Sequence, residues 1–121
     1  MIDYKFIIRG RGEGKTKTLV DCLIDSLNEG ATCVYVGSYY NFINVRNMYE
    51  AQMNTPCPML FVDCDDNISD KIRTSTSKVD LFTDELTNEM GFIITSSLIN
   101  RWADKFDNPR WYITLDKSVV I

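Results

Sequence analysis

A glycine-rich segment near the amino terminus has the composition of a phosphate-binding turn. Glycines at alternate positions lead into a lysine and a threonine: Gly10, Gly12, Gly14, Lys15 and Thr16. Because glycine permits positive φ angles and a close approach, the backbone N–H groups of such a turn can converge on an anion. The lysine would reach the β and γ phosphates of a nucleotide, and the threonine hydroxyl would bind Mg²⁺.

The charges around this turn also favour an anionic ligand. Arg9, Arg11, Lys15 and Lys17 crowd together, which suits a triphosphate. Arg9 stands in place of the first glycine of the full pattern G-x-x-x-x-G-K-[ST], and Glu13 adds a negative charge beside the phosphates. A chance turn is the alternative reading, which the flanking strand and helix patterns disfavour. We expect the cofactor-binding residues to be Gly10, Arg11, Gly12, Glu13, Gly14, Lys15, Thr16 and Lys17.

A later acidic pair could supply the second half of a hydrolytic site. Hydrolysis needs a carboxylate that holds Mg²⁺ and a base that orients the attacking water. Asp84 and Glu85 directly follow an apolar segment, and an aspartate at the carboxyl end of a buried parallel strand faces the nucleotide crevice. We expect Asp84 to bind the metal and Glu85 to act on water. Asp63 is the alternative metal ligand, although Cys64 follows it; a pair that only complements a helix dipole is another alternative.

Apolar patterns of strand and helix type alternate along the chain. The expected strands cover residues 4–8, 32–36, 59–62, 79–83, 92–95 and 111–115, and the expected helices cover residues 16–29, 41–53 and 98–106. This alternation predicts an α/β protein: a single domain over residues 1–121, with three layers (α/β/α) and a mostly parallel sheet. The polar end of the strand at residues 92–95 would hydrogen-bond the γ phosphate or the water.

Composition limits the classes of partner. The net charge of −4 disfavours broad binding to a nucleic-acid backbone, so DNA is a candidate partner only through a local surface. The four cysteines lack CxxC spacing and histidine is absent, so any metal would have oxygen ligands. No apolar run approaches the ~20 residues that span a bilayer, so we expect no membrane partner and a cytoplasmic protein.

The order of turn, acidic pair and polar strand resembles that of P-loop ATPases of the additional-strand type. More narrowly, the chain is similar to the ATPase domain of phage large terminases, which are DNA-packaging motors. Residues 9–16 resemble their phosphate loop, with Arg11 in the same internal place. Residues 34–40 look like their second strand and the segment after it, and residues 60–85 are similar in order to their strand, acidic loop and acidic strand.

This resemblance implies ATP and Mg²⁺ as cofactors and viral DNA packaging or nucleic-acid handling as the driven process. A minimal, phage-encoded domain in the host cytoplasm, without the nuclease domain, would fit it. The resemblance also implies a catalytic arginine. Arg11 would act from within the loop, beside Lys15 and Glu85 as catalytic residues. Alternatively, a neighbouring subunit of a homo-oligomer would supply Arg73, Arg101 or Arg110.

Three functions therefore fit the sequence. The first is a Mg²⁺-dependent ATPase, and the second is a non-hydrolysing nucleotide-binding or protein-interaction module. The third is a small nucleotide kinase, which the absence of clustered arginines after the core strands disfavours. Tyr39 and Tyr40 follow a strand end on the crevice side, where they would contact nucleotide or partner.

Overall fold

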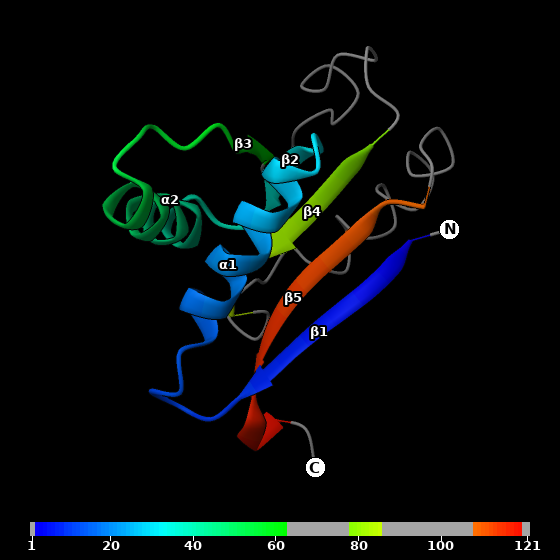
Figure 1. Cartoon of the computed structure of the whole chain (residues 1–121). Coiled ribbons are helices and arrows are strands. Elements are labelled where there is room, and N and C mark those ends of the chain that lie inside the picture. Colours follow the sequence, from blue (N-terminus) through cyan, green and yellow to red (C-terminus); the bar gives the residue numbers. More distant parts are fainter. Residues whose placement is uncertain (1, 63–77, 86–107, 120–121) are drawn as a thin grey trace.

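The computed structural model describes residues 2–62, 78–85 and 108–119. Every strand and helix expected within these residues is present, which confirms the α/β class (Figure 1). The expected strand at 92–95 and helix at 98–106 lie outside the described residues. In chain order the elements are β1 (Asp3–Arg9), α1 (Lys15–Asn28), β2 (Thr32–Val36), α2 (Tyr39–Met53), β3 (Leu60–Val62), β4 (Val79–Thr83), β5 (Arg110–Asp116) and the 3₁₀ helix η2 (Lys117–Val119).

The five described strands form one sheet in the order β1-β5-β4-β2-β3. Every pairing among them is parallel, as expected, and Trp111 of β5 lies between Tyr4 of β1 and Leu81 of β4. The strand that leads into the glycine-rich turn and the strand that leads into the acidic pair are therefore not neighbours. Because parallel strands end at the same edge of a sheet, the residues after β1, β4 and β5 still meet there.

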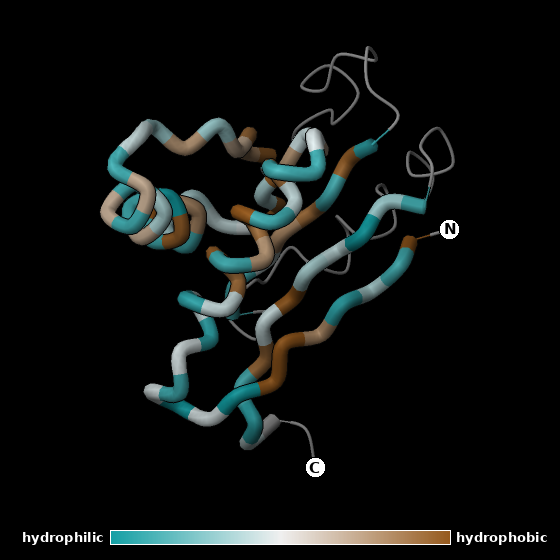
Figure 2. The backbone as a smooth tube through the Cα atoms, viewed as in Figure 1, coloured by the Kyte–Doolittle hydropathy of each residue, from teal (hydrophilic) through white to brown (hydrophobic). Residues whose placement is uncertain are grey.

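The sheet buries a hydrophobic cluster on each face. Along β2, Cys33 and Tyr35 belong to one cluster and Val34 and Val36 to the other, since side chains alternate along a strand. Both described α-helices pack on the Cys33 face, where they contribute Leu19, Val20, Leu23, Phe42, Val45 and Tyr49. Figure 2 shows the hydrophobic residues along the strands and a polar β1–α1 connection. A third layer stays a prediction, because the described helices cover one face.

Helix α2 begins two residues earlier than expected because Ser38 caps it. The Ser38 hydroxyl oxygen accepts a hydrogen bond of 3.3 Å from the backbone N–H of Asn41. Such a cap satisfies one of the N–H groups that a helix start leaves without a partner. The cap fixes where the first turn of α2 stands beside the end of β2.

An ion-pair network joins the amino-terminal ends of β4 and β5. Asp80 is 1% exposed, and its carboxylate accepts hydrogen bonds from Nε and Nη2 of Arg110 at 3.2 and 2.7 Å. These bonds raise the pKa of the Arg110 guanidinium. Glu29, just after α1, pairs with both Arg110 and Lys78. Arg110 lies at the amino-terminal end of β5, whereas the glycine-rich turn follows the carboxyl end of β1. Its contacts therefore favour a structural role over that of a catalytic arginine for a neighbouring subunit.

Removing the Arg110 side chain should destabilise the fold, because the buried Asp80 carboxylate would then lack a cation. We expect Arg110→Ala to lower the free energy of unfolding by about 3 kcal/mol, measured by urea denaturation followed by circular dichroism. Lys78→Ala is the control, since its pair with Glu29 is exposed and its loss should change little. Equal losses in the two variants would contradict a buried role for Arg110. Adding Asp80→Asn to Arg110→Ala should restore part of the stability.

Candidate functional site

The glycine-rich turn connects the last residue of β1 to the first turn of α1. Gly12 and Gly14 have φ angles of 76° and 80°, in the left-handed region where a side chain is strained. Arg9, by contrast, is the last residue of β1, and its φ angle is not positive. Arg9, which stands where the full pattern has its first glycine, is therefore a strand residue with ordinary backbone geometry. It does not disturb the turn.

Glu13 folds back over this turn. Its backbone N–H donates to the Gly10 carbonyl at 3.1 Å, and a Cβ atom built on Gly10 would clash with Glu13 Oε1. The carboxylate is the end of an exposed, flexible side chain. An anion that approaches the turn would therefore displace the Glu13 side chain, while the backbone could stay in place.

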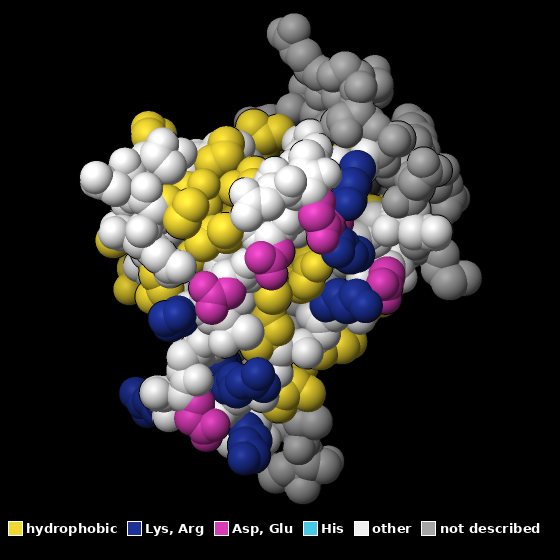
Figure 3. Space-filling model, viewed as in Figure 1, with side chains coloured by type: hydrophobic (Ala, Val, Ile, Leu, Met, Phe, Trp, Pro, Cys, Tyr) yellow, Lys and Arg dark blue, Asp and Glu magenta, His cyan; other side chains and the backbone are white. Residues whose placement is uncertain are grey.

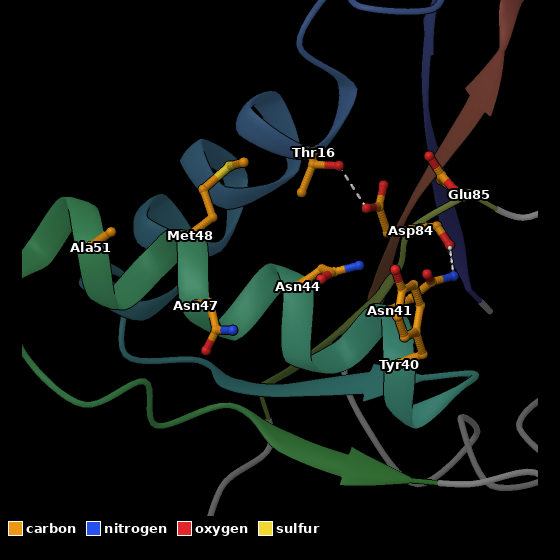
Figure 4. Close-up of a pocket in the computed structure, with 9 residues that line it drawn as sticks. All are labelled: Thr16, Tyr40, Asn41, Asn44, Asn47, Met48, Ala51, Asp84 and Glu85. Atoms are coloured by element: carbon orange, nitrogen blue, oxygen red, sulfur yellow. Dashed lines mark hydrogen bonds between the residues drawn. The ribbon is translucent and has the colours of Figure 1, made fainter.

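The start of α1 meets the end of β4 through Thr16 and Asp84. The Thr16 hydroxyl donates a hydrogen bond of 2.7 Å to Oδ2 of Asp84, although the two residues lie 68 positions apart (Figure 4). Asp84 is 3% exposed. The structure thus brings together the two residues that the sequence suggested for a metal.

Asp84 is held from several sides. Its second carboxylate oxygen accepts a hydrogen bond from the Thr114 hydroxyl of β5. Its backbone N–H donates to the Tyr35 hydroxyl oxygen at 3.0 Å, and its carbonyl accepts from the Asn41 amide at 3.2 Å. These partners fix both the backbone and the carboxylate, so Oδ2 is presented to Thr16 in one orientation.

Glu85 has an unusual backbone conformation at the pocket. Its φ angle is 51°, which few non-glycine residues adopt, and its N–H donates to the Thr114 hydroxyl oxygen at 2.7 Å. Figure 4 places its side chain beside Asp84, facing the same pocket. Strained conformations of this kind concentrate at functional sites, where neighbouring contacts maintain them.

Lys15 is engaged with a residue that sequence reasoning did not select. Its ammonium lies 3.5 Å from Oδ2 of Asp116 at the end of β5, and only 10% of the lysine side chain is exposed. Asp116 also accepts hydrogen bonds from the backbone N–H and the hydroxyl of Ser118, both at 2.9 Å. The Ser118 bonds first, and Lys15 next, lower the pKa of Asp116. The carboxylate is therefore charged at neutral pH.

The other basic candidates lie on the surface around the turn. Arg11 is exposed and makes no ion pair within the described part of the chain. Lys17 is 67% exposed and pairs with Asp21 one turn along α1, at 3.6 Å. Figure 3 shows basic side chains gathered at the lower end of the molecule, where Figure 1 places the turn. Asp63, the alternative metal ligand, lies outside the described residues, as does the polar strand end after residue 95.

A pocket of about 680 Å³ opens beside these residues and runs along α2. Thr16, Asp84 and Glu85 form one end of it, and the exposed face of α2 forms the rest (Figure 4). Among the described residues, no group of three Asp, Glu, Cys or His side chains could hold a metal ion. The donor set is therefore one hydroxyl and one carboxylate oxygen beside an open space. This suits a Mg²⁺ ion, which usually takes its remaining ligands from phosphates and water.

Thr114, Asp116 and Asn41 are the site residues that sequence reasoning missed. Thr114 and Asp116 stand at the carboxyl end of β5, which is the same kind of position that drew attention to Asp84. A polar residue at the end of an expected parallel strand is a weak indication of a site residue, and Thr114 and Asp116 carried it. Which strand lies beside β4, however, is not encoded in any local pattern.

Replacing Thr114 with valine should weaken the acidic corner, by which we mean Asp84, Glu85 and the hydrogen bonds that Thr114 makes to them. Valine has a similar shape but its side chain cannot hydrogen-bond. One carboxylate oxygen of Asp84 and the N–H of Glu85 would lose their partner, so we expect a loss of about 2 kcal/mol in the free energy of unfolding. Urea denaturation measures it. Thr18→Val is the matched control, since the Thr18 hydroxyl bonds the Gly14 carbonyl at an exposed position. If the two variants lose equal stability, Thr114 is not a support of the corner.

Within the described ranges no helix has the length and apolar character needed to cross a membrane. Comparison of the chain with protein-family models, curated proteins and solved structures found no match.

Proposed function

We propose that the chain binds ATP with Mg²⁺ and hydrolyses it. The observation that carries the proposal is the hydrogen bond of 2.7 Å between Thr16 and Asp84. One residue follows a glycine-rich turn and a lysine, and the other follows a buried parallel strand. A Mg²⁺ ion would be held by the hydroxyl and the carboxylate, with phosphate and water oxygens as its other ligands.

The charge of Asp84 supports this assignment. Within the described part of the chain, its carboxylate is bonded to two hydroxyl groups and to no cation. A buried carboxylate without a cationic partner is costly, and a metal ion is the partner that this position would accept. Asp80 differs, because Arg110 already neutralises it.

The remaining residues would bind the phosphates and the water. N–H groups of the turn and the Lys15 ammonium would hold the β and γ phosphates, and exposed Arg11 would reach the γ phosphate. Glu85 would orient a water molecule and accept its proton. The water oxygen would then form a bond to the γ phosphorus while the bond to the β–γ bridging oxygen breaks.

The order of the glycine-rich turn and the acidic pair along the chain resembles that of ATPases of the additional-strand type. By that likeness, the driven process would be DNA packaging or another handling of nucleic acid. A partner subunit would then complete the site with an arginine. A non-hydrolysing module is the alternative, and the Lys15–Asp116 pair favours it because the lysine is already engaged.

Two variants should separate nucleotide binding from hydrolysis. Lys15→Ala should abolish binding of a non-hydrolysable ATP analogue with Mg²⁺ in calorimetry. Glu85→Gln should keep that binding and lower phosphate release at least a hundredfold, since a positioned base contributes 10²–10⁴-fold. Lys5→Ala is the control, because Lys5 pairs with Asp3 on the exposed part of β1. Equal analogue binding in Lys15→Ala and Lys5→Ala would overturn the proposal, and binding without phosphate release in the wild type would favour the non-hydrolysing module.

Asp116→Asn should increase the affinity for the ATP analogue several-fold. The substitution releases Lys15 from a charged partner and removes a negative charge near the phosphates, while asparagine can still accept the Ser118 hydrogen bonds. Calorimetry at low salt measures the change, because salt screens the partly exposed pair. Asp3→Asn, on a distant exposed pair, is the control. A lower affinity in Asp116→Asn would instead mean that Asp116 positions the lysine for the phosphates.

A further inference from the structure

The exposed face of α2 is built differently from an ordinary solvent-facing helix. Tyr40, Asn44, Met48 and Ala51 follow one another at helical spacing and all line the pocket. The core face of the same helix is a separate set, namely Phe42, Val45 and Tyr49. A helix face turned toward solvent usually carries charged side chains. This stripe carries none.

Two of these side chains have unused binding capacity. Tyr40 is 75% exposed at the mouth of the pocket, and no described aromatic ring packs against it. The Asn44 amide makes no hydrogen bond to any described group, and in Figure 4 it points toward the Asp84 end. Met48 is 37% exposed and adds a thioether to the wall. The pocket therefore offers an aromatic face, an adjacent donor and acceptor, and an apolar wall.

We propose that this pocket binds a nucleobase. A heterocyclic base can stack on an aromatic ring such as that of Tyr40, and an amide such as that of Asn44 can bond the donor and acceptor edge of adenine. The volume of about 680 Å³ lies within the range of small-ligand sites and holds a nucleoside. The pocket shares Thr16, Asp84 and Glu85 with the proposed Mg²⁺ site at one end, but the base would contact the α2 stripe and does not need Mg²⁺ or phosphate to be bound.

The charges of the pocket favour a base without an attached phosphate. No described lysine or arginine lines it, whereas Asp84 and Glu85 close one end. A phosphate bound in the pocket without Mg²⁺ would face these two carboxylates. The base would therefore come from a neutral nucleoside, or from a single strand whose phosphates stay outside the pocket.

Calorimetric titration with adenosine and with a short single-stranded oligodeoxyadenylate tests the proposal. We expect Tyr40→Ala and Asn44→Ala each to weaken binding about tenfold, since stacking on one aromatic side chain contributes on that scale. Tyr40→Phe should retain the affinity, because its ring can still stack. Gln52→Ala is the matched amide control: Gln52 lies on α2 outside the pocket and bonds Asp21. All three positions are exposed, so the variants should fold.

The outcomes are distinguishable from those of the ATP proposal. Lys15→Ala should leave adenosine binding intact while it removes binding of the ATP analogue. If the oligonucleotide binds more tightly than adenosine with the same dependence on Tyr40 and Asn44, the base is presented by a strand. No saturable binding of either probe at millimolar concentration, or binding that is indifferent to both alanine variants, would overturn the proposal. Loss of adenosine binding in Lys15→Ala would also overturn it, because the base would then occupy the phosphate turn.

Discussion

The buried carboxylate of Asp84 is the constraint around which the site is organised. A carboxylate that is 3% exposed needs hydrogen-bond partners or a cation. Thr16 of α1 and Thr114 of β5 supply hydroxyl groups, while Tyr35 of β2 and Asn41 of α2 fix the backbone. Four elements thus depend on one residue that follows β4. The observed strand order brings these four partners to Asp84.

Two buried aspartates lie near opposite ends of β4 and have different partners. Asp80, near its start, is matched by a guanidinium, so its charge is neutralised and its role is to hold β4 and β5 together. The carboxylate of Asp84, just beyond the end of β4, accepts hydrogen bonds from two hydroxyl groups, which orient it but do not cancel its charge. The first arrangement stabilises the sheet without a ligand. The second leaves a charge that a bound cation would compensate, and it lies at the end of the sheet where the proposed site stands.

Much of this fold could be predicted from the sequence because its patterns are local. The apolar periodicities located β1 to β5, and the glycines located a turn where Gly12 and Gly14 adopt positive φ. The start of α2 was missed by two residues, because the Ser38 cap outweighed the apolar pattern. Thr114 and Asp116 could not be predicted, since their roles depend on β5 lying between β1 and β4. Strand order is decided by contacts between distant residues, which no local window contains.

The register of β5 explains why both halves of the site assemble together. Thr114 and Asp116 are two residues apart, so their side chains project from the same face of the strand. That face also carries Tyr112, which packs with the helical cluster, and it therefore looks toward the start of α1. Thr114 holds Asp84, and Asp116 holds Lys15. A shift of β5 by one residue would turn both side chains to the other face. One pairing register thus sets the acidic corner and the lysine at once, although neither belongs to β5.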